Sequence, residues 1–232
     1  MNNLELDGPR FGHLAAKVQS AMLAHPFFSA VKVEGFDARL LHSFVEQYEF
    51  ASKGFRKLLG LAIASVNDES ARAQIVDNLW DEYGQGTLSL AHHSLLARFN
   101  DAAFEHMAHS DSASGKALPE TAIYLRGLNA LAMIGDGLLV VGALWFLEAV
   151  TPSEYSVIVS GLRRSYSFSD HEVAFFLDHI GHDGAHLNNL NQIVTTICRT
   201  QQDWHDFESG VAQASVLEAV FWNGVLADAR TK

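Results

Sequence analysis

This chain is poor in cysteine and in basic residues. Cys198 is the single cysteine among 232 residues, which excludes disulfide bonds within the chain and is typical of proteins from a reducing compartment. The chain has 16 lysines and arginines against 27 aspartates and glutamates, so its formal net charge is -11. Binding to nucleic acid requires clustered basic side chains that neutralise phosphates. We therefore expect no nucleic-acid partner.

Targeting and membrane-spanning segments are also missing from the sequence. The N-terminus, Met1 to Asp7, has neither the basic nor the apolar region of a secretory signal peptide, and we expect a cytoplasmic protein. The apolar run from Gly137 to Val150 lacks basic flanks, and it is shorter than the roughly 20 residues that a membrane helix requires. We therefore expect no membrane association.

The pattern of apolar residues is helical throughout. No segment shows sustained alternation of apolar and polar residues, and no repeat, low-complexity tract or interdomain linker interrupts the chain. The sequence therefore predicts an all-α protein with a single domain over residues 1–232. The expected helices cover residues 9–24, 36–52, 54–66, 68–83, 87–108, 119–134, 136–150, 152–165, 169–200 and 203–229.

Two of the expected helix starts carry a capping box. Residues 151–154 (Thr-Pro-Ser-Glu) combine an N-cap threonine, a proline at the first helical position and a capping glutamate. Residues 169–172 (Ser-Asp-His-Glu) form the same box without proline. Glu172 lies on the same helix face as His179, but capping accounts for Glu172 without a metal. We therefore leave Glu172 out of the candidate site.

The most informative segment is the expected helix over residues 169–200, which carries His179, Asp183 and His186 at positions i, i+4 and i+7. At roughly 100° per residue, these positions fall within about 60° of one another, so two imidazoles and a carboxylate share one face. The alternative is the polar outer stripe of a surface helix. The apolar residues around the row would bury much of the helix, so we interpret it as an interior row of metal ligands.

A second candidate ligand is Glu148. The run from Gly137 to Val150 is apolar on every side except for this glutamate, and such a helix is expected at the centre of the fold. A buried carboxylate is strongly unfavourable unless it is paired, protonated or bound to a metal. The alternative is a core glutamate satisfied by an arginine or a main-chain group.

A third candidate is Glu82, which lies in the last turn of an expected helix, where an acid opposes the helix dipole. Gly84 is expected to end that helix in a left-handed conformation, and Thr87 is expected to cap the next one. His92 and His93 lie in the second turn of that next helix, and one of them can face Glu82. Periodicity alone does not decide which.

Taken in order, these segments resemble those of the haem-oxygenase-like diiron oxidases, which are relatives of thiaminase II and of pyrroloquinoline-quinone synthase. The resemblance extends over nearly the whole chain and implies a haem-oxygenase-like helical bundle. It depends on His25-Pro26-Phe27-Phe28, the aromatic-rich stretch from Leu41 to Phe55, Asp81-Glu82-Tyr83-Gly84-Gln85-Gly86, Leu147-Glu148-Ala149-Val150-Thr151-Pro152 and the stretch from Phe175 to His186.

The resemblance also implies a set of metal ligands. In such enzymes a histidine follows the first glutamate by ten residues, which selects His92 over His93. Some members add a carboxylate from an earlier helix, for which Glu46 and Glu49 are the candidates here. The implied ligands are Glu82, His92, Glu148, His179, Asp183 and His186.

The ligand types indicate the metal. Carboxylates and imidazoles without thiolate suit iron or manganese better than structural zinc, and helical bundles commonly hold carboxylate-bridged metal pairs. We expect two Fe(II) ions per chain, with manganese as the alternative metal. Glu82 and Glu148 are expected to be the shared, catalytically central carboxylates. The expected allocation places His92 and His186 on one iron, and His179 and Asp183 on the other.

The resemblance implies an oxidoreductase that uses O2 to oxidise a small-molecule substrate, by N-oxygenation, C–C cleavage or desaturation. An acidic protein with a largely apolar cavity favours a substrate with an apolar body and a cationic or zwitterionic end. Amino acids and amines therefore come first, and fatty acids second. The candidate pocket residues are the aromatics nearest the expected ligands, Tyr48, Trp80, Tyr83, Trp145 and Phe176.

Three other interpretations share the fold. A thiaminase-II-like hydrolase needs a cysteine nucleophile, but Cys198 lies outside any such motif. A cofactor-free oxidase of the quinone-synthase kind would use the histidines without metal. A non-catalytic helical ligand-binding protein would neither hold metal nor consume O2. The sequence leaves the assembly state open, with a homodimer as one option.

Overall fold

The computed structural model describes residues 3–107, 115–135, 137–181 and 185–231. Within these ranges the chain forms ten α-helices and two short 3₁₀ helices and no strand, which confirms the predicted all-α class. The helices are α1 (Asn3–Leu23), α2 (Pro26–Glu34), α3 (Ala38–Ser65), α4 (Glu69–Glu82), η1 (Gly84–Gly86), η2 (Leu88–Leu90), α5 (His92–Met107), α6 (Pro119–Leu131), α7 (Leu138–Ser165), α8 (Ala174–Gly181), α9 (Ala185–Ile197) and α10 (Gln201–Thr231).

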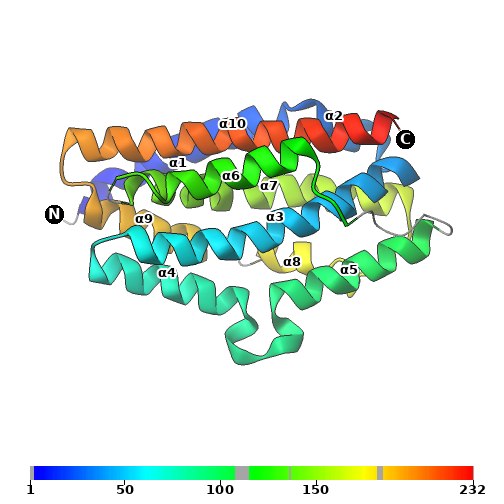
Figure 1. Cartoon of the computed structure of the whole chain (residues 1–232), viewed down its shortest axis with the longest axis horizontal. Helices are drawn as coiled ribbons and strands as arrows, with labels where there is room; N and C mark the ends of the chain where they lie inside the picture. Colours follow the sequence, from blue (N-terminus) through cyan, green and yellow to red (C-terminus); the bar gives the residue numbers. More distant parts are fainter. Residues whose placement is uncertain (1–2, 108–114, 136, 182–184, 232) are drawn as a thin grey trace.

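Helix α7 lies at the centre of the bundle. It packs against α1, α2, α8, α9 and α10, and more lightly against α3 and α6. In Figure 1 the helices α3, α6, α7 and α10 run along the long axis of the molecule, and α4 and α5 follow each other along its lower edge. The residues from Val140 to Phe146 are all buried. The apolar run around Glu148 is therefore the central helix that its composition predicts.

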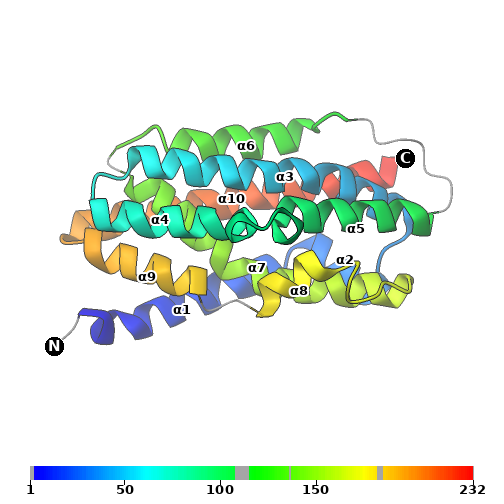
Figure 2. The same ribbon diagram turned by 90° about the horizontal axis from the view of Figure 1, so that it is seen from below.

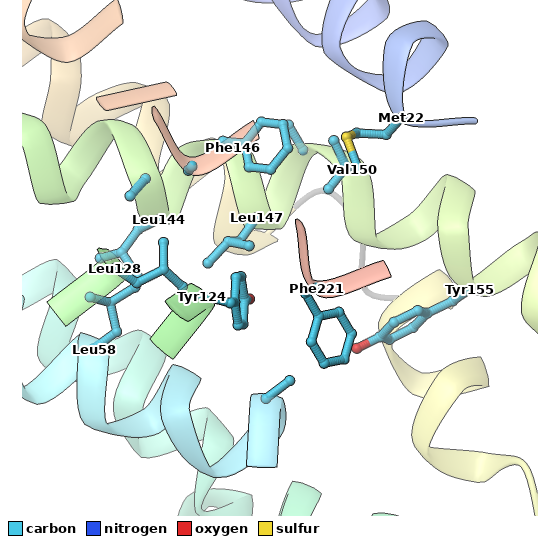
Figure 3. Packing of buried hydrophobic residues seen from close by; sticks show 14 of the residues in the cluster. Met22, Leu58, Tyr124, Leu128, Leu144, Phe146, Leu147, Val150, Tyr155 and Phe221 are labelled. Carbon is cyan, nitrogen blue, oxygen red and sulfur yellow. The ribbon is translucent and has the colours of Figure 1, made fainter. Parts of the chain in front are cut away.

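Helices α7 and α10 pack with their main chains in close contact because two glycines lie where they cross. A Cβ atom at Gly142 would lie 2.2 Å from the main-chain oxygen of Phe207, and one at Gly210 would lie 2.1 Å from that of Leu139. No larger residue fits at either position. The core beside α7 also receives side chains from α3, α6 and α10, and Figure 3 shows Leu58, Tyr124, Leu128, Leu144, Phe146, Leu147, Val150 and Phe221 among them.

The predicted break in α7 at Thr151 does not occur, and the predicted capping box over residues 151–154 is wrong. Thr151 Oγ1 instead donates to the main-chain oxygen of Leu147 at 2.7 Å, within one continuous helix. Pro152 lacks the N–H that would bond to the main-chain carbonyl of Glu148. The helix continues because its apolar residues are buried on both sides of the proline.

Two further predicted boundaries differ near the start of the chain. Residues 36–52 and 54–66 were predicted as separate helices, but α3 is continuous because its apolar face stays buried across the join, from Ala51 to Leu58. Helix α2 is not among the predicted helices. It begins at Pro26, after the N-cap residue His25, whose Nδ1 accepts the N–H of Phe27 at 3.2 Å.

The capping box at Ser169 is present. Ser169 N donates to Glu172 Oε2 at 2.7 Å, and Glu172 N donates to Ser169 Oγ at 3.3 Å, although the regular helix α8 begins only at Ala174. The helix predicted over residues 169–200 is represented in the described residues by two helices, α8 and α9.

The helix predicted to start at Thr87 begins instead at His92. The chain between α4 and α5 turns twice, because Gly84 and Gly86 have positive φ angles of 66° and 86°, and Gln85 has a φ of 52°. The left-handed conformation predicted for Gly84 is confirmed. The two 3₁₀ helices fill this turn, which projects from the lower edge in Figure 1.

A second pair of helices lies opposite α4 and α5. Helix α9 packs against α4 and α8 packs against α5, so the pair α4 and α5 and the pair α8 and α9 lie side by side, as Figure 2 shows. The end of α4, the start of α5, the end of α8 and the start of α9 lie near the middle of the molecule. Across the described ranges, no helix combines the length and apolar character needed to cross a membrane.

Candidate metal centre

Four of the predicted ligands lie at the neighbouring ends of α4, α5, α8 and α9. Glu82 is the last residue of α4, and His92 is the first residue of α5. His179 lies in the last turn of α8, and His186 lies in the first turn of α9. Glu148 comes from the middle of α7, which packs against both α8 and α9. The packing of these five helices therefore brings candidate ligands from all of them to one place.

Glu82, His92 and His179 form a compact group, whose potential ligand atoms all lie within 4.8 Å of one another. His92 Nδ1 is 2.8 Å from Glu82 Oε1, and His179 Nε2 is 4.0 Å from the same oxygen. The side chain of His92 is 7% exposed, that of Glu82 is 4% exposed and that of His179 is 12% exposed. One carboxylate and two imidazoles without thiolate match the ligand chemistry of iron or manganese. His93, in contrast, is exposed.

The protonation of His179 is fixed by its surroundings. Its Nδ1 lies 2.7 Å from the main-chain oxygen of Phe175, and a carbonyl only accepts, so Nδ1 carries the proton. Burial, followed by the charge of His92, lowers the pKa of His179. The ring is therefore neutral, and its Nε2 lone pair faces Glu82. Metal-binding histidines commonly donate their other ring N–H in this way.

His92 lies between two carboxylates. Its Nδ1 faces Glu82 and its Nε2 lies 3.3 Å from Asp178 Oδ2. Burial lowers the pKa of His92, but the hydrogen bonds and charges of Asp178 and Glu82 outweigh it and raise the pKa to about 9. Burial likewise raises the pKa of Glu82, but His92, His179 and Arg56 outweigh it, and the net pKa is lowered. Without metal, His92 and Glu82 thus form an ion pair.

His186 has the same arrangement around Glu148. Its Nδ1 lies 3.5 Å from Glu148 Oε1 and its Nε2 lies 3.1 Å from Asp81 Oδ2. Burial lowers the pKa of His186, but Glu148 and Asp81 outweigh it and raise the pKa to about 9. The partner that the sequence required for Glu148 is therefore a histidine of the candidate site.

The grouping of the histidines differs from the expected allocation. His92 lies beside His179, with 4.3 Å between ring centroids, because α5 packs against α8. His186 lies beside Glu148 instead, because it is in the first turn of α9, which packs against α4 and α7. The pairing of His92 with His186 on one iron does not follow from this geometry. Asp183 lies outside the described residues.

Neither candidate for a further carboxylate reaches this group. Glu46 is buried and lies 3.6 Å from His42 Nδ1, and the exposed Glu49 pairs with Lys53 at 2.6 Å. The additional carboxylates beside the histidines are instead Asp178 and Asp81, which the sequence did not assign to the site. Each is adjacent to a predicted ligand in the sequence, but its partner histidine lies 86 or 105 positions away.

Two cavities adjoin the candidate centre. An outer cavity of about 420 Å³ is lined by His92, His186, Asp178 and Asp81. An inner cavity of about 60 Å³ is lined by Glu82 and by residues of α3, α6, α7, α8 and α10. Glu148, Thr151 and His179 line both. These three residues therefore lie where the two cavities meet.

Most of the predicted pocket aromatics lie elsewhere. Tyr48 lines the inner cavity, and its hydroxyl makes a short hydrogen bond with that of Tyr155. Trp80 and Tyr83 are 54% and 45% exposed and line neither cavity. Trp145 and Phe176 are core residues, and the Trp145 indole donates to Asn191 Oδ1 at 2.7 Å. Large aromatics at helical spacing here mostly build the core.

The inner cavity is also lined by two buried acids that the sequence did not assign to the site. Glu154 of α7 is 2% exposed and Glu218 of α10 is 6% exposed. Burial and the proximity of Glu218 raise the pKa of Glu154 well above its usual range. Burial raises the pKa of Glu218 to about 8. At neutral pH this pair therefore holds protons that ordinary carboxyls release.

We expect Glu218→Gln to raise the melting temperature at pH 8 more than at pH 5. The pKa of Glu218 is about 8 in the folded protein against 4.5 for an ordinary glutamate, so between these values only the folded state holds the proton. The free energy of unfolding therefore falls as pH rises through this window. The variant lacks this loss, and each kcal/mol gained raises the melting temperature by about 2–4 °C.

Thermal melts of Glu218→Gln and the wild type at both pH values, with the exposed Glu49→Gln as control, measure the difference. An equal shift at pH 5 and pH 8, or a shift shared by the control, would contradict the raised pKa.

The arrangement of helices is the haem-oxygenase-like fold. Solved structures with this fold include a domain of unknown function from Shewanella denitrificans (TM-score 0.77, 16% identity, 97% of this chain and 94% of that chain covered). They also include a CADD-like protein of unknown function from Nostoc punctiforme (TM-score 0.77, 18% identity, 95% and 98% covered) and a TenA homologue from Pseudomonas syringae (TM-score 0.73, 11% identity, 94% and 92% covered). At such low sequence identity, the structural similarity establishes the fold alone, and it confirms the predicted haem-oxygenase-like bundle.

The sequence family adds the chemistry. Residues 42–219 match the family described as iron-containing redox enzymes, and the chain belongs to this family. The chain is also 26% identical over 186 residues to a 4-aminobenzoate synthase from Chlamydia muridarum, with 78% of this chain and 75% of that protein covered. Membership of an iron-containing redox family agrees with the group of Glu82, His92 and His179.

Proposed function

We propose that this protein is a non-haem diiron oxidase or oxygenase that uses O2 to oxidise a small molecule bearing an amine. The observation that carries the proposal is the buried group of Glu82, His92 and His179, in a chain of an iron-containing redox family. Two imidazoles and a carboxylate are presented from three different helices. Helical bundles frequently hold dinuclear iron in this way.

The residues fit two metal positions. Glu82, His92 and His179 would hold one iron, since their ligand atoms already converge. Glu148 and His186 would contribute to the second, together with Asp183, which the sequence places on the same ligand row. Glu82 and Glu148 are the described carboxylates among these residues, and both would help to hold the metals.

The chain's own side chains hold the ligands in place. Asp178 accepts a hydrogen bond from Nε2 of His92, and Asp81 accepts one from Nε2 of His186. The Nδ1 atom of each ring therefore faces a candidate ligand carboxylate, which is Glu82 for His92 and Glu148 for His186. Such carboxylate–histidine pairs fix ring orientation and raise ligand basicity. Protonated His92 and His186 must lose a proton before either can bind metal, so metal binding competes with protons.

When bound, iron would supply the activation of O2. The chain would supply a substrate position at Glu148, Thr151 and His179, where the two cavities meet. Phe175 and Leu147 line the inner side of this position and limit the access of water. The name of the 4-aminobenzoate synthase among the relatives gives a small molecule with an amine as the product of that protein, and we propose a small molecule of the same class as the substrate here.

The proposal predicts that the protein binds about two iron atoms per chain and that the iron-loaded form consumes O2. Protein loaded anaerobically with Fe(II) would be freed of excess metal, analysed by atomic emission and mixed with oxygenated buffer in an oxygen electrode. We expect the uptake of O2 to accelerate with the correct compound from a panel of amino acids, aliphatic amines and medium-chain fatty acids, because substrate binding in an enclosed site displaces water.

The metal-depleted protein is the matched control. Equal oxidation by metal-free protein would favour the cofactor-free oxidase. Iron-loaded protein that consumes no O2 with any compound would favour a ligand-binding protein of the same fold.

A further inference from the structure

The inner cavity contains an acid pair that neither metal position uses. Glu154 Oε1 and Glu218 Oε2 are both buried and make no hydrogen bond within the described residues. The indole N–H of Trp222 lies near both carboxyl groups, and this proximity lowers their pKa values by less than burial raises them. The indole nitrogen is itself buried without a well-formed hydrogen bond. An unsatisfied buried polar atom destabilises a folded protein. Two such oxygens at one cavity indicate a binding site rather than a structural pair.

The contrast with the other buried acids supports this interpretation. Glu82 is neutralised by His92 and lies 4.0 Å from Arg56 Nη1, and Glu148 faces His186. No lysine or arginine is among the described residues that line the inner cavity. Tyr48, Tyr124 and Tyr155 also line this cavity, and burial raises the pKa values of their hydroxyls well above the usual range. The acid pair therefore has no basic side chain beside it in this cavity, and a positively charged group of a ligand would complement it.

The position and size of the cavity suit one end of a molecule. Its walls run from Glu154 and Glu218 to Glu148 and His179 at the candidate metal centre. A volume of about 60 Å³ accommodates a head group, whereas the outer cavity of about 420 Å³ accommodates a larger body. Between the two ends, Leu147, Tyr124, Phe221 and Tyr155 form an apolar and aromatic wall, and Figure 3 shows these side chains around the same part of the core.

We propose that Glu154 and Glu218 form a subsite for the primary ammonium group of the substrate, with the carbon skeleton extending past Glu148 and His179 into the outer cavity. This inference rests on the proposed function, because it names the end of the molecule that the same site binds. Two carboxyl oxygens and the neighbouring tyrosine hydroxyls offer the acceptors that the three N–H groups of an ammonium need.

Binding of an ammonium group changes the protonation of the pair. An ammonium is complementary to a carboxylate, so at least one carboxyl gives its proton to the buffer when the cation binds, and the new ion pair replaces the proton shared by the two acids. We therefore expect binding near pH 7 to release a proton. The groups that face the pair are Tyr48, Tyr124, Tyr155 and Trp222, and none of them titrates near this pH.

The test measures binding without turnover. Anaerobic Fe(II)-loaded protein would be titrated in a calorimeter with butylamine, butanol and butyrate, which all have four carbon atoms and carry a cationic, a neutral and an anionic end group. We expect butylamine to bind at least about 10-fold more tightly than either analogue. Glu154→Gln and Glu218→Gln should each weaken butylamine binding about 10-fold, and the double variant should abolish it. Repetition in buffers of different ionisation enthalpy reports the released proton.

A matched control and a second measurement keep the result interpretable. Glu46→Gln alters an equally buried glutamate that lies outside both cavities, and it should leave butylamine binding unchanged. Circular dichroism melts verify that each variant is folded. Unchanged butylamine affinity in folded Glu218→Gln, or preferred binding of butyrate, would overturn the subsite. Butylamine binding that depends on the acid pair in a protein without O2 uptake would overturn the oxidase proposal and leave the subsite in place.

Discussion

His179→Ala is expected to remove most of the bound iron and to lower the rate of O2 consumption by more than about 100-fold, because it deletes a metal ligand outright. The His179 ring is neutral, 12% exposed, and held with Nε2 toward Glu82 by the hydrogen bond from Nδ1 to the Phe175 carbonyl. Among the described residues, only Glu82, His92 and His179 have ligand atoms that all lie within 4.8 Å of one another. Loss of His179 leaves only two members of this group.

His93→Ala is the matched control for this prediction. His93 is adjacent to His92 in the sequence but is exposed to solvent, so its removal should leave the iron content near that of the wild type. The measurement is iron per chain after anaerobic Fe(II) loading, together with initial O2 uptake. Full iron retention in folded His179→Ala, or equal iron loss in His93→Ala, would contradict the assigned centre.

The fold class was predictable because helical periodicity is a local property of the sequence. The boundaries were not, because tertiary burial decides them. Residues 151–154 carry all the local signals of a new helix, yet Thr151 bonds back to Leu147 and α7 continues through Pro152. The loss of one hydrogen bond at the proline costs about 1 kcal/mol. Burial of the apolar residues of α7 on both sides of the proline stabilises the helix by more than this amount.

The candidate ligands were predictable in part. Glu148 could be selected as a candidate because it is a single acid in an apolar run. A buried carboxylate needs a partner, and this requirement follows from its burial alone. The choice of His92 over His93 required the resemblance, since both lie within one turn of the same helix. The structure places His92 beside Glu82 because α5 begins at His92 rather than at Thr87.

The partners of the histidines were not predictable from local pattern. Asp178 precedes His179 by one residue and therefore points to a different side of α8, where it meets His92 of α5. Glu154 was assigned to a capping box, a local explanation that hid its burial. Glu218 offered a usable signal, since it lies in the apolar run from Val216 to Trp222 just as Glu148 lies in its own.

Asp178→Ala is expected to weaken Fe(II) binding about 10- to 100-fold without deleting a ligand. Asp178 Oδ2 lies 3.3 Å from His92 Nε2 and holds the ring so that Nδ1 faces Glu82. Without this acceptor the ring can rotate, and the loss of the nearby negative charge makes His92 a weaker donor to a cation. The midpoint of an anaerobic Fe(II) titration, followed by visible absorption or Mössbauer spectroscopy, measures the change.

Three comparisons separate this positioning role from general damage to the protein. Asp178→Asn keeps the acceptor and should recover part of the affinity. Asp77→Ala removes an exposed aspartate of α4 and should have no effect. In metal-free protein, Asp178 is one of the two groups that raise the pKa of His92 to about 9, so NMR titration of His92 in Asp178→Ala should show a lower pKa. An unchanged His92 pKa with weakened iron binding would contradict the mechanism, because the loss would then not act through the orientation and charge of this ring.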